Sequence, residues 1–563
     1  MPALARPAGE TTLELPPRRA RLAADTDVLV VGGGPAGIGA AVGAADAGAR
    51  VVLAERYGFL GGNATAALVM PLMSFHTQQP VPEQRGATTL LPTDHGPGEP
   101  VIAGVLKRLL EKLVAAGGAI PPSLATGYVV PFDPEWFKLI ALELLDEAGV
   151  QFLFHAFASD VLQENHSVRG VVFETKSGPV AIRARVVIDC SGDGDIAVRA
   201  GAPHEIGRAD GLAQPMTLMF RIAEFERAAF DAYVRENPKE WRGVHGLWAL
   251  VRRATEEGRL ELPREDMLFF ATPHEGEVSV NSTRVTRVLG ADVWDLSYAE
   301  WMSRRQMRQI AAFLRRYVPG FERSYVMQSG VNVGVRETRR ILGDYQLTAE
   351  DVLGARKFDD AIARGSYPVD IHNPKGSGTV LKRLPPGEAY DIPLRCLLPR
   401  NAEGLLVAGR CLSGTHEAHS SYRVMPIVMA TGHAAGVAAA KVDHHGPAGS
   451  QHAGAVAVLA RLAHELAGMQ VSRPHYPTQR DENRFNLWVA HAPSQPSDRI
   501  SGRQIGKKRS VQRRTRCRQM PPEPLKVVTF PTNARVGFSM EKCRSRSSES
   551  ADGSGTTAIH ASV

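Results

Sequence analysis

A glycine-rich turn between an apolar segment and a run of small residues constrains the fold of this chain more than any other feature. Residues 28–31 are aliphatic without interruption, which is typical of a parallel strand buried on both faces. The pattern GxGxxG follows, and its glycines permit a tight turn, a close approach to a pyrophosphate and close packing of a helix on a sheet. The sequence therefore predicts a βαβ unit that binds a dinucleotide. Its phosphate-binding turn comprises Gly32, Gly34, Pro35, Ala36 and Gly37.

An acidic residue ends the predicted βαβ unit. Residues 51–54 form its second strand, and Glu55 follows 18 residues after Gly37. A carboxylate at a spacing of about 20 residues accepts hydrogen bonds from a ribose, and it disfavours a 2′-phosphate. The unpaired N–H groups and the dipole at the start of the intervening helix favour an anion. We therefore expect an adenosine dinucleotide without a 2′-phosphate.

Composition excludes several classes of protein. With 44% hydrophobic and 22% charged residues, the chain of 563 residues has the composition of a globular protein of two or three domains. No apolar run reaches the length of about 18 residues that a membrane span needs. The N-terminal segment also lacks the apolar region of a signal peptide. We therefore expect a cytoplasmic protein with no membrane span.

The net charge of +7 comes from one segment near the end of the chain. Residues 499–546 contain 14 Lys and Arg against two acidic residues, so the remainder carries a net charge of −5. The segment lacks the interleaved aromatic residues that are typical of nucleic-acid-binding surfaces. We therefore expect nucleic acid not to be a partner.

The five cysteines form neither a CxxC motif nor a cluster with histidine. This pattern supports neither a zinc site nor an iron–sulfur cluster within the chain, and we predict no metal site. Isolated thiols are the favoured interpretation. A redox-active pair drawn from Cys190, Cys396 and Cys411 is the alternative.

The loop after Glu55 carries a second glycine pair, in the motif GGNAT at residues 61–65. An acid, a short loop and a Gly-Gly turn resemble the flavin-binding segment of FAD-dependent oxidoreductases of the glutathione-reductase and fumarate-reductase type. The motif itself resembles that of a subgroup related to the flavin-binding part of heterodisulfide reductase. The resemblance implies FAD, held without a covalent bond because the loop lacks the histidine of the flavinylated relatives. The contacts that it implies here are Arg56, Gly61, Gly62 and Asn63.

Two later strands resemble the other flavin contacts of this family. Residues 185–189 lead into a Gly, Asp and Ser turn, where Asp193 is a candidate for a sugar or ribityl hydroxyl contact or, equally, a plain turn residue. Residues 404–409 resemble the strand that closes the flavin site at Gly409. The next residue is Arg410, where fumarate-reductase relatives often have an acid, so we expect a phosphate contact. Met425 opens a helix whose positive end is expected at the flavin pyrimidine edge.

Candidate substrate-binding residues follow from charge and spacing. Arg336, Arg339 and Arg340 lie three and four residues apart, which predicts a shared helix face. A pair of guanidinium groups suits a carboxylate, whereas ion pairs with Glu337 and Asp344 or a solvated face are the alternatives. The resemblance favours Arg336, because a VRETRR-like segment recurs in the subgroup.

A loop dense in ionisable groups follows the closing strand. His416 is the candidate acid or base, because its ordinary pKa lies near neutrality, and Glu417 is expected to orient it. With Arg336, Arg423 is expected to hold an anionic substrate. A histidine that is merely buried and hydrogen-bonded is the competing interpretation of His416. His419 is a weaker candidate.

The expected fold class is α/β, with a Rossmann-like, three-layer ββα FAD-binding domain, an inserted α+β substrate domain and a disordered C-terminal tail. Helices are expected over 101–116 and after Asp133, a β-meander over 159–183 and an exposed excursion over 77–100. The expected parts are a leader (1–24), the first FAD-binding part (25–204), the substrate domain (205–390), the returning FAD-binding part (391–445), a terminal helix (446–475) and a basic tail (476–563).

The sequence thus predicts an FAD-dependent oxidoreductase that transfers a hydride between flavin N5 and a small, anionic organic substrate. Three alternatives stay open. The first is an NAD-dependent dehydrogenase that uses the same glycine pattern. The second is an electron-transfer subunit with an iron–sulfur protein or a quinone as partner. The third is a flavoprotein that binds nucleic acid through its basic tail.

Overall fold

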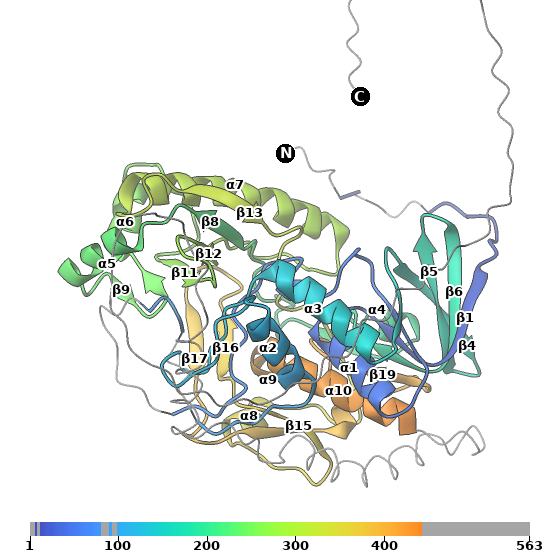
Figure 1. The fold of residues 1–563 in the computed structure, drawn as a ribbon. Coiled ribbons are helices and arrows are strands. Elements are labelled where there is room, and N and C mark those ends of the chain that lie inside the picture. Colours follow the sequence, from blue (N-terminus) through green and yellow to red (C-terminus); the bar gives the residue numbers. More distant parts are fainter. Residues whose placement is uncertain (1–5, 8, 10–11, 80–88, 93–97, 442–563) are drawn as a thin grey trace, which may run out of the picture. The chain divides into compact units, whose positions relative to one another are not determined.

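The computed structural model describes residues 6–7, 9, 12–79, 89–92 and 98–441, all of which belong to one compact unit (Figure 1). The helix expected over 446–475 and the tail expected over 476–563 lie outside the described residues. No helix of the described part is both long and apolar enough to cross a membrane.

A mixed sheet of seven strands carries the predicted βαβ unit. The strand order is β3-β2-β1-β6-β5-β4, and β19 pairs with residues 187–189 of β6. The pairs among β3, β2, β1, β6 and β19 are parallel, whereas β4 and β5 are antiparallel to their neighbours. The strands are β1 (Arg21–Val31), β2 (Val51–Ala54), β3 (Gln151–Leu153), β4 (Phe157–Glu164), β5 (Ser167–Thr175), β6 (Gly178–Asp189) and β19 (Leu405–Val407).

The aliphatic segment that identified the first strand lies at the centre of this sheet. Val28 of β1 pairs with Val51 on one side and with Val186 on the other. Because helices or other strands cover both faces here, an uninterrupted aliphatic run is favoured over an alternating one. Val28, Leu29 and Val30 are fully buried as a result.

Helices α1 (Pro35–Asp46) and α10 (Met425–Lys441) pack against each other with their backbones in contact. A Cβ atom added to Gly432 would lie 1.9 Å from the carbonyl oxygen of Ala36, and one added to Gly436 would lie 2.0 Å from that of Ala40. Helices α2 (Val105–Ala115) and α3 (Pro134–Glu147) pack beside them (Figure 1). The close approach of α1 and α10 therefore requires glycine at positions 432 and 436.

A second sheet of six strands in the described part lies wholly between residues 220 and 329. It is antiparallel, with the order β13-β8-β12-β11-β10-β9. Phe230, Trp241, Phe269 and Phe321 pack in a buried aromatic cluster on it. Its strands are β8 (Phe220–Ala223), β9 (Trp241–Arg242), β10 (His245–Gly246), β11 (Met267–Ala271), β12 (Val278–Val280) and β13 (Tyr325–Ser329).

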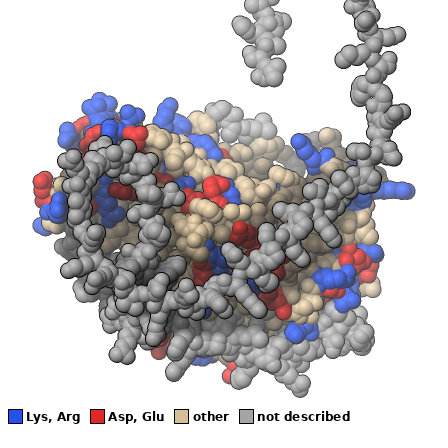
Figure 2. All heavy atoms as spheres, in the orientation of Figure 1, with Lys and Arg blue, Asp and Glu red and all other residues tan. Residues whose placement is uncertain are grey.

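Three helices accompany the second sheet: α5 (Arg227–Glu236), α6 (Trp248–Glu256) and α7 (Val293–Tyr317). On the face shown in Figure 2, Lys, Arg, Asp and Glu side chains gather over these helices. This is the expected distribution, because each helix turns its apolar side to the sheet and its charged side to solvent.

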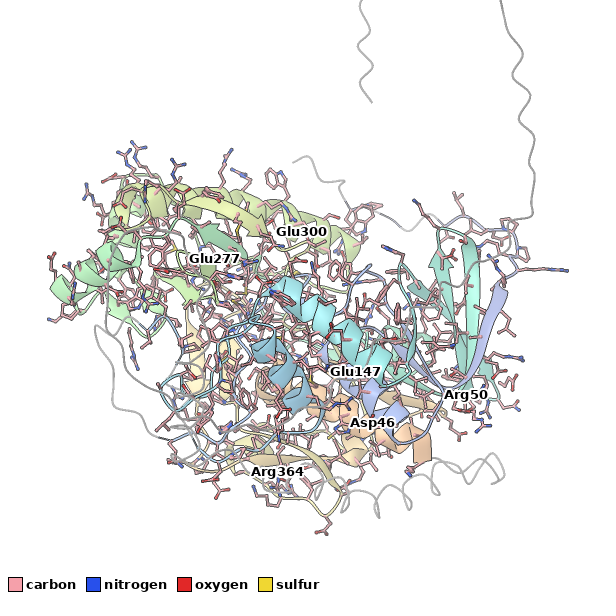
Figure 3. All side chains as sticks on the ribbon, in the orientation of Figure 1. Asp46, Arg50, Glu147, Glu277, Glu300 and Arg364 are labelled. Carbon is pink, nitrogen blue, oxygen red and sulfur yellow. The ribbon has the colours of Figure 1, made fainter. Side chains whose placement is uncertain are left out.

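A buried ion-pair group joins the second sheet to α3. Arg221 of β8 forms ion pairs with Glu277 of the loop before β12 and with Asp133, the latter at 3.1 Å. Figure 3 labels Glu277 on this sheet. His274 also contacts Asp133, at 2.7 Å. Since Asp133 is at the same time the N-cap of α3, one carboxylate fixes both the helix start and the sheet.

Several shorter elements complete the described part. They are α4 (Asp195–Arg199), α8 (Ala349–Leu353), α9 (His416–Tyr422), β7 (His204–Ile206), β14 (Arg339–Ile341), β15 (Ala361–Gly365), β16 (Val369–His372), β17 (Thr379–Lys382), β18 (Tyr390–Pro393), η1 (Gly62–Ala64) and η3 (Leu394–Cys396). Strand pairs form between β7 and β14, between β15 and β18 and between β16 and β17.

Most predicted elements of the FAD-binding part are confirmed. The βαβ unit, the meander β4-β5-β6, the closing strand β19 and the helix from Met425 are all present. Asp133 caps α3 as expected, because its Oδ1 accepts hydrogen bonds from the N–H groups of Glu135 (2.7 Å) and Trp136 (3.3 Å). The α/β class and the presence of a second, antiparallel sheet agree with the expectation.

The predicted helix through the arginines is wrong. Residues 330–338 form a loop, and Arg339 and Arg340 belong to β14, so the three guanidinium groups share no helix face. Each arginine contacts a different part of the molecule: Arg336 the carbonyl of Pro215, Arg339 the carboxylate of Asp195, and Arg340 that of Glu337. The contacts of Arg336 and Arg339 with distant residues and the pairing of β14 with β7 outweigh the helical spacing.

Two smaller expectations are also corrected. The leader was expected to reach residue 24, but β1 already begins at Arg21, where it pairs with β6. The segment 77–100 is expected to be exposed, and this holds for only part of its described residues: Gln79, Thr89 and Glu99 are exposed, whereas Thr77, Leu90 and Leu91 are buried. Leu90 and Leu91 pack in the core of the second sheet.

Candidate active site

A cavity of about 1120 Å³ extends from the carboxyl ends of β1, β2, β6 and β19 to the second sheet. Gly32, Glu55, Cys190 and Gly409 line it at the first sheet. Ligand pockets in proteins usually measure about 300–1,000 Å³, so this cavity has room for a dinucleotide and a further small molecule. Its position outside the carboxyl ends of parallel strands is the place where open α/β sheets bind ligands.

The glycine turn fits a pyrophosphate at the start of α1. The N-cap residue Gly34 has no side-chain hydrogen bond to the helix, so the first N–H groups of α1 are left for an anion. A Cβ added to Gly34 would meet only the Cα of Gly62, at 3.7 Å, whereas one added to Gly37 would lie 1.8 Å from the carbonyl oxygen of Gly32. The missing side chain of Gly34 therefore leaves space in the cavity, while that of Gly37 permits the turn.

Glu55 lines the cavity and also holds the glycine turn. Its Oε2 accepts a hydrogen bond from the N–H of Gly33 at 2.6 Å, and its Oε1 accepts one from the N–H of Tyr57 at 2.9 Å. Burial raises the pKa of this carboxyl group, and the backbone hydrogen bonds oppose the rise. Its predicted contact with a ribose stays a prediction.

The second glycine pair lies directly against the first. The N–H of Gly61 donates to the carbonyl of Gly33 at 2.8 Å, and a Cβ on Gly62 would lie 2.9 Å from the Cα of Gly34. Gly62 and Asn63 line the cavity, and the Asn63 side chain donates to the carbonyl of Val335 at 3.1 Å. Both glycine motifs of the sequence thus form one wall.

Asp193 and Arg410 form an ion pair next to the cavity. Arg410 Nη2 lies 2.6 Å from Asp193 Oδ1, to which the hydroxyl of Thr338 also donates, at 2.8 Å. Arg410 lines the cavity but Asp193 is not among its lining residues. The structure therefore shows Asp193 as the partner that orients Arg410, and its predicted sugar or ribityl contact stays a prediction.

Three arginines meet where the cavity passes from the first sheet toward the second: Arg284, Arg336 and Arg423. Arg284 is only 5% exposed and donates to the carbonyls of Gly376 and Gly378. Neither Arg284 nor Arg336 forms an ion pair with a carboxylate of the described residues. Arg423 lies 3.9 Å from Asp370. Desolvation and the neighbouring charges lower the pKa of Arg336 to about 9 and that of Arg284 to about 10.

His372 lies within this group of arginines. Its Nδ1 accepts a hydrogen bond from Arg284 Nη2 at 3.2 Å, and its Nε2 faces Asp370 Oδ2 at 3.5 Å. An Nδ1 that accepts from a guanidinium leaves the ring proton on Nε2, toward the carboxylate. Desolvation and the charge of Arg336 lower the pKa of His372 to about 4, so the ring is neutral at pH 7.

Comparison with known families decides the broad class of the molecule. The profile of the family described as FAD dependent oxidoreductase matches residues 27–449, which is most of the chain. The chain belongs to this family. It is therefore an FAD-dependent oxidoreductase, and FAD is its cofactor.

Individual relatives are distant. The thiamine thiazole synthase of Aeropyrum pernix is 32% identical over 198 residues, which cover 33% of this chain and 62% of the relative. The chain thus matches less than two thirds of that curated relative. Among solved structures, a geranylgeranyl bacteriochlorophyll reductase-like protein from Thermoplasma acidophilum is 15% identical, with a TM-score of 0.38 and 83% and 86% of the two chains covered. p-Nitrophenol 4-monooxygenase of Pseudomonas putida is 13% identical, with a TM-score of 0.36 and 83% and 94% covered.

The residues of the cavity fit FAD. The space over Gly34 and the unpaired N–H groups of α1 suit a pyrophosphate, and the start of α10 at Met425 and the closing residue Gly409 line the same cavity. The part of the cavity beyond Met425 leads to the arginine group. The family match favours this FAD-dependent oxidoreductase over the NAD-dependent alternative, while the likeness to heterodisulfide reductase stays a prediction.

The sequence-predicted catalytic residues are only partly brought together. Arg336 and Arg423 line the cavity, but His416 does not. Instead, His416 is 5% exposed and its Nδ1 donates to Glu337 Oε1 at 2.9 Å, so Glu337 and not Glu417 is its partner. The strand pairing of β14 brings Glu337 under α9, which explains why a histidine close to the closing strand turns away from the cavity.

Arg284, Asp370 and His372 are functional candidates that were not predicted from the sequence. They lie in the region 205–390, which has no nucleotide motif, and they come together only through contacts between the second sheet and β16. One local signal existed. Asp370 and His372 are two residues apart on a strand, and side chains at that spacing share a face. Cys190, Cys396 and Cys411 are buried free thiols in the structure.

Proposed function

We propose that this FAD-dependent oxidoreductase acts on a small organic anion, by hydride transfer between the substrate and flavin N5. Bound FAD supplies the hydride acceptor or donor. The chain itself has to bind the anion, hold it beside the cofactor and handle the proton that accompanies the hydride.

The observation that carries the proposal is a surplus of buried positive charge in the cavity. Arg284 and Arg336 lack ion-pair partners among the described residues, and Asp370 is the carboxylate that faces both Arg423 and His372. A buried charge without a counter-ion is strongly unfavourable, so buried arginines are normally paired. An anionic ligand would supply the missing negative charge, and planar guanidinium groups suit a carboxylate.

The proton is assigned to His372 in this proposal. Its ring contacts Arg284 through Nδ1 and faces Asp370 through Nε2, so both nitrogens lie within reach of charged groups that fix the ring. The neutral imidazole can accept a proton only at Nδ1, after an anionic substrate has taken over the guanidinium of Arg284, and Asp370 at Nε2 then stabilises the imidazolium. Arg336 and Arg423 keep their predicted role of holding the anion.

Binding of carboxylates to the purified holoprotein tests the proposal. Acetate, butanoate, hexanoate and octanoate are titrated while the absorbance of the bound flavin is followed. We expect Arg336→Gln to weaken this binding by about tenfold to a hundredfold, since a hydrogen bond to a charged group contributes about 1.5–3 kcal/mol. Arg252→Gln, on the exposed side of α6, is the matched control.

Two results would contradict the proposal. One is a flavin spectrum that no carboxylate perturbs. The other is an Arg336→Gln variant that loses FAD while its affinity for carboxylates is unchanged, because this would assign the arginine to the cofactor. Anaerobic flavin reduction by a panel of 2-hydroxy acids, amino acids and thiols then identifies the reaction.

Transfer of electrons to an iron–sulfur protein or a quinone is the alternative that the sequence left open. It requires a partner that supplies the second redox centre, because the cysteines of the chain lack the spacing of a cluster motif. Iron that co-purifies with the native protein would favour this alternative.

A further inference from the structure

A second polar group lines the cavity on the second sheet. It consists of His245 on β10, Asp266 just before β11 and Arg264 in the preceding loop. None of these residues belongs to the arginine group that carries the proposed anion site. The apolar side chains of Val244 and Leu268 line the cavity beside them.

The three side chains form a chain of fixed contacts. His245 Nδ1 lies 3.0 Å from Asp266 Oδ2, and Arg264 donates to Asp266 Oδ1 from Nη2 at 2.8 Å. Arg264 also donates to the carbonyl of Asn281 at 3.3 Å, which ties it to the end of β12. A carboxylate that is held on both sides leaves the imidazole little freedom to turn.

These contacts also determine which ring nitrogen faces the cavity. Burial opposes ionisation of Asp266, but the hydrogen bond from His245 and the charge of Arg264 outweigh it and lower the pKa of the carboxyl group. An ionised Asp266 accepts only, so Nδ1 of His245 carries a proton, and whenever the ring holds a single proton Nε2 presents a lone pair. No residue in the described part of the chain forms a hydrogen bond with Nε2, and the side chain is 37% exposed.

We propose that His245 is a specificity-determining residue whose Nε2 accepts a hydrogen bond from a hydroxyl group of the substrate. This inference rests on the proposed anion site, because the carboxylate end of the substrate would lie at Arg284 and Arg336. The substrate class is then a hydroxylated organic acid with an apolar segment between its two polar ends. Met219, Leu268 and Phe270 line the cavity and suit that segment.

The wall between the two groups is continuous. Arg264 contacts the carbonyl of Asn281, and Arg284 follows three residues later in the same loop, where it donates to His372. One loop of the second sheet thus connects both polar ends of the cavity. A fixed separation between them predicts a preference for one length of substrate.

The test compares straight-chain carboxylates with their ω-hydroxy counterparts in the holoprotein. Affinities of butanoate, hexanoate and octanoate are measured by flavin absorbance, each beside its 4-, 6- or 8-hydroxy acid. At one chain length, we expect the hydroxy acid to bind about five- to tenfold more tightly, the contribution of one hydrogen bond.

Two substitutions separate the nitrogens of His245. In His245→Asn the amide replaces Nδ1 and keeps the contact with Asp266, but nothing replaces Nε2, so the preference for the hydroxy acid should vanish. In His245→Gln the longer amide reaches the position of Nε2, and part of the preference should remain. His204→Gln, at an exposed histidine of β7, is the matched control.

The outcomes distinguish this inference from the proposed function. If no carboxylate binds, both are overturned. If carboxylates bind but a terminal hydroxyl gives no advantage at any length, or if His245→Asn keeps the advantage, only the role of His245 is overturned. Loss of the preference in His245→Asn with unchanged affinity for the unsubstituted acids supports it.

Discussion

Gly34 and Gly37 belong to one sequence pattern but lack a side chain for different reasons. At Gly37 a Cβ would lie 1.8 Å from the carbonyl of Gly32, so the turn itself excludes it. At Gly34 the protein offers space, and the backbone φ of −72° suits any residue. Only the cofactor requires glycine at this position.

We therefore expect Gly34→Val to fold and to lose FAD. Its apoprotein should have the melting temperature of the wild-type apoprotein, and the purified variant should be colourless, since the side chain occupies the pyrophosphate space. Absorbance and thermal unfolding measure both properties. Gly37→Ala is the comparison: it should destabilise the apoprotein itself, and a Gly34→Val protein that binds FAD normally would contradict the assignment of the turn.

His416, the acid or base predicted from the sequence, is held by the buried carboxylate of Glu337. Glu337 is 1% exposed, accepts from Arg340 at 2.5 Å and from the N–H of Gln214 at 3.0 Å, and also holds His416. We expect Glu337→Gln to lower the free energy of unfolding by about 3 kcal/mol, because the buried Arg340 would lose its buried carboxylate and keep only the more exposed Glu205, at 3.3 Å. Urea unfolding of the holoprotein measures this loss.

His416→Gln tests the corrected role directly. We expect flavin reduction by substrate to change by less than about twofold, because general acid–base catalysis is worth about a hundredfold or more and His416 lies outside the cavity lining. His372→Gln is the companion variant, in which the large loss is expected. A hundredfold slower His416→Gln protein would return this residue to the mechanism.

At the level of residues, the glycine-rich wall of the cavity could be predicted, as could Arg336 and Arg423 in its lining, whereas Arg284 and His372 could not. Gly34, Glu55 and Gly62 act through local backbone geometry, which a short motif records. Arg284 and His372 lie 88 residues apart and meet only through folding of the region between the two FAD-binding parts. No local pattern contains such a contact.

At the level of elements, the contact between α1 and α10 holds the first turns of both helices in the lining of the cavity. Met425 and Pro426 line the cavity at the first turn of α10, and Pro35 and Ala36 line it at the first turn of α1. The glycines of the two helices set the distance between these turns. The cofactor site therefore depends on residues that do not touch it.

Gly432→Ala should separate the two helices. Its Cβ would lie 1.9 Å from the carbonyl oxygen of Ala36, and neither backbone can move without shifting the first turn of α1. We expect a loss of about 1–3 kcal/mol in the free energy of unfolding and weaker FAD binding. Gly376→Ala, where a Cβ meets nothing within 4 Å, is the control. Unchanged FAD affinity in Gly432→Ala would contradict this view of the helix pair.

The incorrect helix at the arginines shows where element prediction fails. Arginine spacing suggested a helix, but the segment is extended. Gly334 forms a bridge with Thr217, and β14 pairs with β7. Both partners lie more than 100 residues earlier in the chain, so the local spacing of the arginines does not contain this information.

At the level of the whole molecule, buried histidines connect stability to pH. Burial lowers the pKa of His372 and of His76 to about 4 and lowers that of His419 well below its ordinary value. Below about pH 6.5 the unfolded chain binds protons that the native protein does not. The free energy of unfolding therefore falls as the pH decreases from about 6.5 toward 4. Glu55 and Asp189, whose pKa values burial raises, act in the opposite direction.

His419→Leu isolates one of these contributions. His419 is fully buried, and neither ring nitrogen has a hydrogen-bond partner in the described part of the chain. Removing it should reduce the pH dependence of the free energy of unfolding by at most about 1.4 kcal/mol per pH unit below pH 6.5. Urea unfolding at several pH values measures the slope, with His204→Leu at an exposed position as control. Equal slopes in both variants would contradict the sign worked out here.

Strand β6 pairs with β1 along its length, with β5 over its first half and with β19 over its last three residues. A nascent chain on the ribosome makes β1, α1, β2 and β6 long before it makes β19 and α10. Until then the lining residues Gly409, Met425 and Pro426 are missing from the cavity. The site that fits FAD is therefore complete only after residues 405–441 have been synthesised.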